Sequence, residues 1–239
     1  MLAAGKSTRI RSVAGRLPKP VLPIAGRPII EWNLRWLAES GVREVWVNLH
    51  HEPNAIQAAL GDGREWGLRV RYHYEPEILG TAGAWRSLAD HWGTRTLVVY
   101  GDNLVRFDLA AFVAAHDGSR ALATIALFDP LKHVNTGIAG GKAALDEEGC
   151  IVTFVEGAHL PDGTRGLVNA GVYVLERRLL EGFPSGFADF GRDVLPEVAR
   201  SGRLRGHVIE SGGYCLGMDT PESWEVAEEL VRAQRVVLR

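Results

Sequence analysis

Cysteine is scarce in this sequence, and its two cysteines form no recognisable pattern. Cys150 and Cys215 lie far apart among the 239 residues, without C-x-x-C or Cys/His spacing. We therefore expect neither a disulfide framework nor a zinc site, and a reducing compartment is the default. The expected location is cytoplasmic.

The sequence also lacks a long hydrophobic run and a basic cluster. No stretch approaches the roughly 18 apolar residues of a membrane span, and the opening residues 1–5 are too short for a secretion signal. The 27 basic and 29 acidic residues are spread along the whole chain, with a formal net charge of −2. We therefore expect no membrane and no nucleic acid as partner, and any phosphate binding must be local.

The first half of the chain alternates strand-length apolar runs with segments of helical period. The predicted strands are residues 45–49, 68–74, 96–100 and 121–128, and the predicted helices are residues 29–40, 53–60 and 82–91. This alternation predicts an α/β fold: a Rossmann-like, mainly parallel mixed sheet with helices on both faces. Ligands of such sheets bind at the carboxyl ends of the strands.

After about residue 130 the strands become shorter, at 151–155, 168–175 and 204–209, and residues 224–235 form a predicted closing helix. We expect a single domain over residues 1–239, in which residues 1–130 form one half. Residues 131–239 complete the sheet and add a small substrate-facing lobe.

The start of the chain is unusual. If Leu2-Ala3-Ala4-Gly5 ends the first strand, about two residues remain to build it, whereas strands average about five. We expect a few native residues to precede Met1 in the natural protein.

Small residues and cations near the start suggest a phosphate-binding loop. Leu2-Ala3-Ala4-Gly5-Lys6-Ser7-Thr8-Arg9 is followed by Pro18-Lys19-Pro20. Small residues let main-chain N–H groups approach a triphosphate, on which Lys6, Arg9 and Lys19 could converge. The loop is neither a Walker A motif nor G-x-G-x-x-G. Taken alone, it is equally compatible with a polar surface turn.

A carboxylate follows the strand predicted at residues 96–100. Gly101-Asp102-Asn103 places Asp102 at a strand's carboxyl end, which suits Mg²⁺ because this ion needs only one or two carboxylates beside phosphate oxygens and water. An Asp that caps a turn is the alternative interpretation.

Together these segments resemble the sugar-1-phosphate nucleotidyltransferase family, whose signature is L-x-A-G-x-G-T-R followed by P-K-P. Ser7 stands at the signature's second glycine. The resemblance implies that the loop wraps a nucleoside triphosphate, that Arg9 binds pyrophosphate and that Lys19 steadies the phosphates. It also makes Arg9, Lys19 and Asp102 the expected catalytic residues. Leu2, Ala3, Ala4, Gly5, Lys6, Ser7 and Thr8 are then expected to bind nucleotide.

The family's G-D-N segment matches Asp102, and residues 213–222 resemble its closing strand, usually D-x-G-T-P-E. Here Gly217 stands at the usual Asp position and Asp219 at the usual glycine. Because positions i and i+2 of a strand share a face, Asp219 can still reach the same ion. We expect Asp102 and Asp219 to hold Mg²⁺. The M-D-T ending resembles the cytidylyltransferase branch.

The resemblance places the base pocket at residues 75–83, where Gly80 and Thr81 expose main-chain groups. Glu75 occupies the base-reading position, and its two acceptor oxygens suit the N1–H and amino group of guanine, which favours GTP. The alternative is that Glu75 is a solvated strand end.

The sugar side is expected to use Asn103, Gly137, Glu156 and Asn169, since amides and carboxylates suit ring hydroxyls. Gly157 replaces the lysine of the family's E-K-P, so Lys19 or Arg165 is expected to compensate. Residues 189–196 resemble a segment near the sugar that is commonest among mannose- and heptose-type guanylyltransferases. His50 and His51 are expected to be structural, because nucleotidyl transfer requires neither.

The expected reaction joins a nucleoside triphosphate to a sugar-1-phosphate and releases pyrophosphate. Uridylyl, thymidylyl or cytidylyl transfer to another hexose-1-phosphate remains an alternative, as does a regulatory protein that binds nucleotide-sugar without turnover. A dinucleotide-dependent oxidoreductase would need the absent G-x-G-x-x-G. A homo-oligomer is possible.

Overall fold

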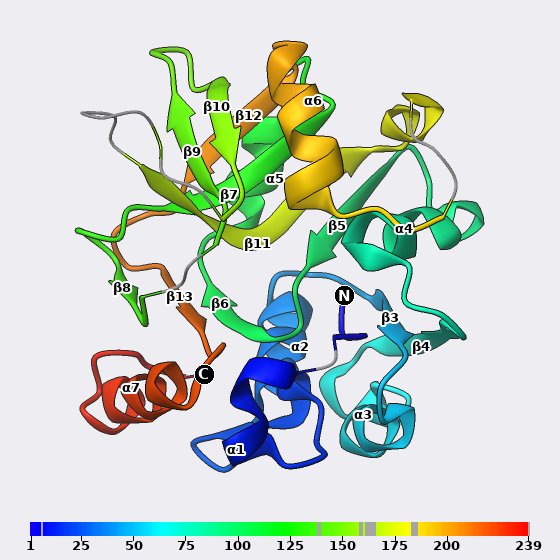
Figure 1. Ribbon diagram of the computed structural model, residues 1–239, viewed down its shortest axis with the longest axis vertical. Coiled ribbons are helices and arrows are strands. Elements are labelled where there is room, and N and C mark those ends of the chain that lie inside the picture. The colour runs from blue at the N-terminus through cyan, green and yellow to red at the C-terminus, as the bar shows by residue number, and fades with distance from the viewer. Residues whose placement is uncertain (6, 138–139, 158–159, 161–165, 183–185, 239) are drawn as a thin grey trace.

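The computed structural model describes residues 1–5, 7–137, 140–157, 160, 166–182 and 186–238 (Figure 1). Its α-helices are α1 (Arg11–Ala14), α2 (Ile29–Glu39), α3 (Pro53–Leu60), α4 (Gly80–Ser87), α5 (Leu109–Asp117), α6 (Leu195–Arg200) and α7 (Pro221–Arg232). Its strands are β1 (Pro23–Ile24), β2 (Arg27–Pro28), β3 (Glu44–Leu49), β4 (Arg69–Tyr74), β5 (Arg95–Val99), β6 (Asn103–Arg106), β7 (Ala123–Phe128), β8 (Val134–Asn135), β9 (Lys142–Leu145), β10 (Ile151–Val155), β11 (Leu167–Glu176), β12 (Leu204–Val208) and β13 (Tyr214–Gly217).

The predicted elements lie close to the observed ones, within the usual uncertainty of element ends. Helix α3 and strand β10 have the predicted bounds, and α2 stops one residue early. The helix predicted at residues 82–91 is two elements, α4 and a 3₁₀ turn at Ala89–His91. The closing helix begins at Pro221 because the hydroxyl of Thr220 accepts a hydrogen bond from the backbone N–H of Ser223.

The α/β class is confirmed, but the expectation of a mainly parallel sheet is wrong. Strands β3 and β4 are parallel, and Leu2 forms parallel bridges to Asn48 and Tyr100. The largest sheet, β10-β9-β11-β7-β12 with β5 also on β11, is antiparallel except at β7–β12. Strands β9 and β10 are joined by a short turn, whereas parallel neighbours need a crossover of about a dozen residues or more.

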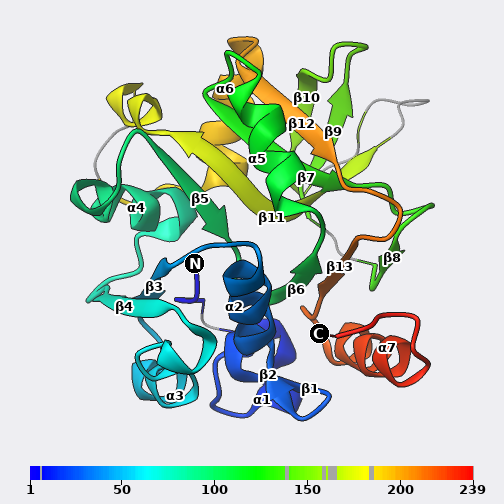
Figure 2. The same ribbon diagram turned by 180° about the vertical axis from the view of Figure 1, so that it is seen from behind.

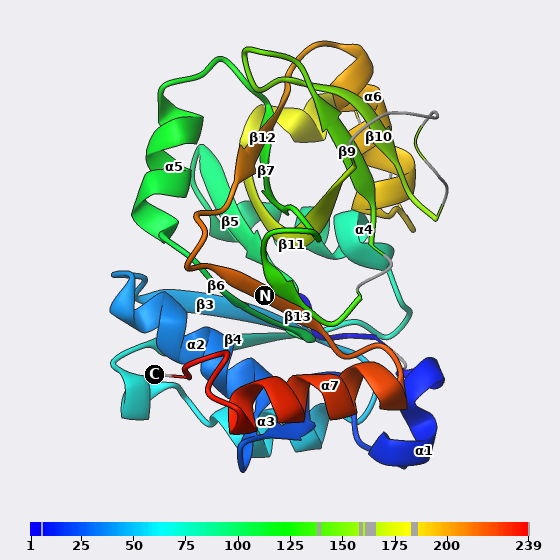
Figure 3. The same cartoon turned by 90° about the vertical axis from the view of Figure 1, so that its left-hand side faces the viewer.

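Three apolar clusters hold these layers together. The first joins α2 to β3 through Leu34, Leu37 and Val47. The second lies between the large sheet, α4 and α6, in the upper part of Figure 3. The third places α7 against α1, β1 and the start of α2, and the views from the front, behind and the side agree on this arrangement (Figures 1, 2 and 3). No helix among the described residues is long and apolar enough to cross a membrane.

One strand pair brings two distant segments together. Strands β6 and β13 are antiparallel, with Asn103 opposite Gly217. The turn that precedes β6 and the segment that follows β13 therefore lie at the same end of this small sheet. Asp102 belongs to the first segment and Asp219 to the second, although 117 residues separate them in the sequence.

Candidate active site

Lys19 is the centre of the site. It lies in a 3₁₀ turn, Lys19–Val21, between Pro18 and Pro20, and is 7% exposed. Its Nζ contacts Oδ2 of Asp102 at 2.6 Å and also Oδ1 of Asp219. Burial alone would lower the pKa of Lys19, but the two carboxylates outweigh burial and raise it.

Asp219 receives a second cation from the N-terminal loop. Nη2 of Arg9 lies 3.3 Å from Oδ1 of Asp219, and two-thirds of the Arg9 side chain is exposed. Burial would raise the pKa of Asp219, but Lys19 and then Arg9 hold it below its usual value. Both carboxylates therefore face cations before any ligand binds.

The loop before Arg9 contains a residue in a left-handed backbone conformation. Ser7, at the signature's second glycine, has φ of +52°, a left-handed conformation that glycine adopts most readily. Its hydroxyl accepts a hydrogen bond from the backbone N–H of Lys19 at 2.6 Å. Thr8 begins the 3₁₀ turn Thr8–Ile10, and Lys6 lies outside the described residues.

Two neighbouring cavities meet at Lys19. The first, of about 280 Å³, is bordered by the loop; its lining includes Leu2, Ala3, Gly5, Ser7 and Arg9. The second, of about 400 Å³, is lined on its far side by Asn103, Glu156, Asn169, Gly171 and Arg192. Both share Arg9, Lys19, Thr81, Tyr100, Asp102 and Asp219. The expected phosphate side and the expected sugar side thus adjoin at the carboxylates.

Glu156 lines the second cavity beside two glycines. A Cβ atom at Gly141 would lie 2.5 Å from Oε2 of Glu156, and one at Gly191 would collide with the same oxygen. Burial and the nearby Asp189 raise the pKa of Glu156. Because neither glycine has a side chain, the carboxylate of Glu156 has room at the cavity wall.

Asn169 reaches the same cavity but is already hydrogen-bonded. Its Nδ2 donates to the hydroxyl of Tyr173 at 2.7 Å, and its Oδ1 accepts from the N–H of Gly171 at 2.9 Å. These bonds fix the amide within an irregular stretch of β11. Gly137 does not line this cavity; it is exposed and lies beyond Asp219, in a hollow with Thr136 and Thr220.

Glu75 does not face either cavity. It is 1% exposed; Oε1 accepts from Nδ2 of Asn48 at 2.7 Å, and Oε2 accepts from the N–H of Leu79 at 3.1 Å. The same Asn48 accepts from the N–H of Ala3 at 2.7 Å. Through Asn48, Glu75 therefore connects the segment before α4 to the N-terminal loop by hydrogen bonds. Its burial rules out the alternative of a solvated strand end.

The start of α4 is positioned by hydrogen bonds to Asp189 and by close packing against Ala188. The N–H and hydroxyl of Thr81 both donate to Oδ1 of Asp189, at 3.1 and 3.3 Å. Gly80 has φ of +74°, and a Cβ there would lie 2.5 Å from the carbonyl oxygen of Ala188. Thr81 lines both cavities, whereas Gly80 lines neither of them. Nδ1 of His50 lies 2.9 Å from the carbonyl oxygen of Glu75.

Two site residues were not singled out by the sequence. Asn48 gives no local signal, because its partners Ala3 and Glu75 lie 45 and 27 residues away. Arg192 brings a cation into the second cavity and contacts Asp189 at 3.3 Å. The segment 189–196 pointed to this place, although Arg192 itself was not picked out. Arg165, the suggested compensating cation, lies outside the described residues.

The carboxylate groups of this site suit Mg²⁺, which needs few protein ligands, better than a metal ion that is held by protein ligands alone. Asp102 and Asp219 converge on one position, which the Lys19 ammonium now occupies. Among the described residues no group of three or more His, Cys, Asp or Glu side chains is placed to hold a metal ion. Mg²⁺ typically uses one or two carboxylates together with phosphate oxygens and water.

The fold and this arrangement define a class of α/β protein with a charged double cavity around a buried lysine and two carboxylates. The nucleotidyl transferase family model matches residues 1–225, and the chain belongs to that family.

Curated relatives show several specificities. The chain is 30% identical over 215 residues, 84% of its length, to a UTP–glucose-1-phosphate uridylyltransferase of Synechocystis. It is 32% identical over 226 residues, 94% of its length, to a mannose-1-phosphate guanylyltransferase of Mycobacterium tuberculosis. It spans 55% and 61% of those two proteins. It is 27% identical to a D-glycero-alpha-D-manno-heptose 1-phosphate guanylyltransferase of Campylobacter jejuni, over 94% of this chain and 95% of that protein.

A solved structure shares the whole fold. HddC from Yersinia pseudotuberculosis is 26% identical, with a TM-score of 0.77, covering 95% of this chain and 96% of that one.

Replacing Asn48 should destabilise the protein. Asn48→Ala leaves the Oε1 acceptor of Glu75 and the N–H of Ala3 without this partner in a buried region, which costs about 1–3 kcal/mol. Urea unfolding measures the loss. Asn54→Ala, at an exposed position of α3, is the matched control and should stay within about 0.5 kcal/mol of the parent. Equal stabilities for the two variants would contradict the bridging role of Asn48.

Proposed function

We propose that this protein transfers a nucleotidyl group from a nucleoside triphosphate to a sugar-1-phosphate and releases pyrophosphate. The observation that carries the proposal is the convergence of Lys19, Asp102 and Asp219 between two adjoining cavities. A reaction that joins two phosphate-bearing substrates needs a charged junction of this kind. Family membership supports the same chemistry.

In the proposed reaction the triphosphate lies in the loop-lined cavity, with its α-phosphorus at the junction. An oxygen of the sugar-1-phosphate attacks that phosphorus from the second cavity. The new P–O bond forms as the bond from the α-phosphorus to the α,β-bridging oxygen breaks, and the departing pyrophosphate keeps the electron pair. The attacking phosphate is already an anion, so no general base is required.

The cations of the site have distinct places in this scheme. Arg9 and the loop N–H groups lie on the pyrophosphate side, where negative charge accumulates. Lys19 lies between the two substrates and offsets their mutual repulsion. Asp102 and Asp219 would hold Mg²⁺, which supplies charge neutralisation and orientation of the phosphate oxygens when bound.

The sugar-1-phosphate is assigned to the second cavity. Glu156 and Asn103 offer acceptors and donors for ring hydroxyls, and Arg192 is a candidate for the phosphate contact that the lysine missing at position 157 would provide. In this proposal residues 1–130 form the nucleotide half and residues 131–239 the sugar half of one domain.

We further propose GTP as the nucleotide and a mannose- or heptose-type sugar. Two curated relatives that match 94% of the chain carry guanylyltransferase names, for mannose- and heptose-1-phosphate. Because another relative is a UTP–glucose-1-phosphate uridylyltransferase, UTP and glucose-1-phosphate are the second candidate pair of substrates. The preference for guanine no longer depends on Glu75, because its carboxylate is buried in bonds to Asn48 and Leu79.

The deciding experiment measures pyrophosphate release with Mg²⁺ over a matrix of substrates. GTP, UTP, dTTP, CTP and ATP are each combined with mannose-, glucose-, N-acetylhexosamine- and heptose-1-phosphate. We expect release with GTP and a mannose- or heptose-type substrate, and its loss when EDTA removes the metal. Tight nucleotide binding with no release from any pair would favour a regulatory protein instead.

A second test addresses the carboxylate pair. Asp102→Asn should lower kcat about a hundredfold or more, because it removes a proposed metal ligand worth several kcal/mol in the transition state. Asp90→Asn is the matched control, since 98% of that side chain is exposed and it lies outside both cavities. Asp102→Asn with control-level kcat would remove Asp102 from the mechanism.

A further inference from the structure

Helix α2 buries a polar side chain among apolar ones. Asn33 is fully buried, as are Ile30 and Leu34 beside it on the same helix. A buried amide must replace its hydrogen bonds to water with bonds inside the protein, and asparagine is a poorer helix former than leucine. Asn33 is therefore unfavourable for the helix itself, and its contribution must come from the groups that its amide binds.

The amide of Asn33 is hydrogen-bonded to the backbone of β6. Its Nδ2 donates to the carbonyl oxygen of Asn103 at 2.7 Å, and its Oδ1 accepts from the N–H of Val105 at 3.3 Å. In an extended strand, the backbone groups of residues i and i+2 point to the same edge. Among the described strands β6 pairs only with β13. The amide of Asn33 therefore takes the place of a strand partner at the other edge of β6.

The strand held in this way begins directly after Asp102. On the other side of Asp102, the N–H of Gly101 donates to the carbonyl oxygen of Leu2 at 2.8 Å. The backbone around Asp102 is therefore held by one contact to the N-terminal segment and one to α2. Its carboxylate lies 2.6 Å from Nζ of Lys19. Because Asn103 follows Asp102 directly, a displacement of Asn103 would also move this carboxylate.

We propose that Asn33 is a positioning residue for the carboxylate pair. From α2 it fixes the start of β6, and thereby the place of Asp102 relative to Lys19 and Asp219. Asn33 lines neither of the two cavities that meet at Lys19, so it acts through the backbone and touches no ligand. The effect of Asn33 on catalysis rests on the proposed nucleotidyl transfer, whereas its effect on the geometry of the site does not.

Two substitutions of Asn33 test this role. Asn33→Leu nearly keeps the shape of the side chain but removes both hydrogen bonds to β6. Asn33→Ser is the milder variant, because its smaller side chain leaves room for a water molecule that can bind the same backbone groups. If the leucine variant fails to fold, the serine variant decides the question by the same measurements.

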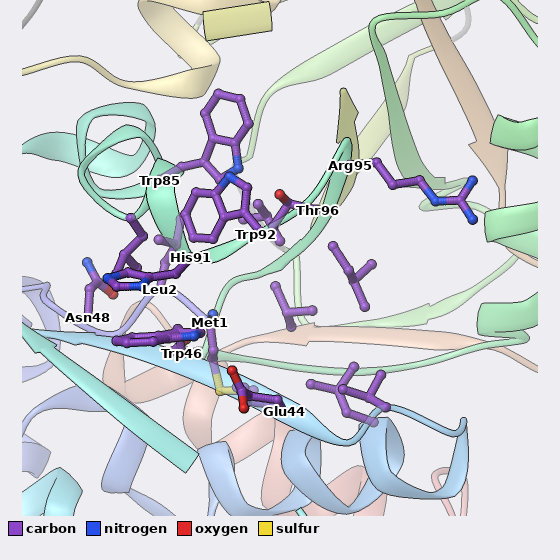
Figure 4. Close-up of a pocket in the computed structure, with 17 residues that line it drawn as sticks. Met1, Leu2, Glu44, Trp46, Asn48, Trp85, His91, Trp92, Arg95 and Thr96 are labelled. Atoms are coloured by element: carbon purple, nitrogen blue, oxygen red, sulfur yellow. Dashed lines mark hydrogen bonds between the residues drawn. The ribbon is translucent and has the colours of Figure 1, made fainter. Parts of the chain in front are cut away.

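Leu37→Ala is the matched control on the same helix. Leu37 is buried in the first apolar cluster and lines a separate cavity of about 280 Å³. Figure 4 shows this cavity, with Trp46, Trp85 and Trp92 in its wall. Neither carboxylate of the site lines it. Leu37→Ala and Asn33→Leu should each lower Tm by about 5–10 °C, so loss of stability alone cannot separate them.

Chemical labelling of lysine measures the geometry of the site without any substrate. Lys19 is buried between the two carboxylates, whereas Lys132 is exposed and serves as an internal reference. Reductive methylation of the native protein, followed by mass spectrometry, gives the rate at Lys19 relative to Lys132. Asn33→Leu should raise this ratio about tenfold, because the site opens more often once β6 is loosened. Leu37→Ala should leave it within about twofold of the parent.

Steady-state kinetics give the second readout, at a temperature well below Tm and with the substrate pair that the parent turns over fastest. Asn33→Leu should lower kcat by about tenfold to a hundredfold, because a displacement of about 1 Å at a catalytic group has an effect of this size. The KM for the nucleotide should change less than kcat, since the loop that borders the first cavity is intact. Leu37→Ala should keep the kcat of the parent.

Two outcomes would overturn the proposal. The first is a folded Asn33→Leu protein with a lowered Tm but with the Lys19 labelling of the parent, which would show that Asn33 serves stability alone. The second is an equal rise of Lys19 labelling in Leu37→Ala, which would show that any loss of stability in α2 opens the site. If the parent releases pyrophosphate from no substrate pair, the proposed function fails, but the labelling ratios still decide the role of Asn33.

Discussion

One buried ammonium group joins three distant parts of this molecule. Lys19 comes from the N-terminal segment, Asp102 from the turn before β6, and Asp219 from the segment after β13. Separating a buried charge from its partners costs several kcal/mol, so each carboxylate holds the lysine in place and the lysine holds the carboxylates together. The site is therefore part of the framework of the fold as well as a place for ligands.

Two backbone arrangements make this contact possible. The pairing of Asn103 with Gly217 brings the two carboxylate segments to one sheet end, and the prolines around Lys19 restrict the turn that presents the ammonium group. A second buried network, from Ala3 through Asn48 to Glu75, sets the start of the N-terminal loop. The start of the loop is thus fixed by Asn48 and Glu75, neither of which lines the two cavities that meet at Lys19.

The sequence predicted the elements well and their pairing poorly. Apolar periodicity located α2, α3, β10 and β11, because periodicity reports which residues face a core. It carries no information on strand direction, so the antiparallel surroundings of β11 were not predicted. Resemblance to a family drew attention to Lys19 and Asp102. It drew equal attention to Glu75, whose buried carboxylate is hydrogen-bonded to Asn48, a residue with no signal of its own in the sequence.

The glycines beside Glu156 restrict how this protein can change over time. Neither Gly141 nor Gly191 has a positive φ, so a side chain at either position is opposed by neighbouring atoms and not by backbone angle. A Cβ at Gly191 would meet only the exposed side chain of Glu156, whereas one at Gly141 would also lie 2.5 Å from the ring of Phe154. Position 191 can therefore acquire a side chain if Glu156 moves aside, but position 141 is held to glycine by an aromatic ring as well. The shape of this cavity is thus open to evolutionary change at one glycine and closed to it at the other.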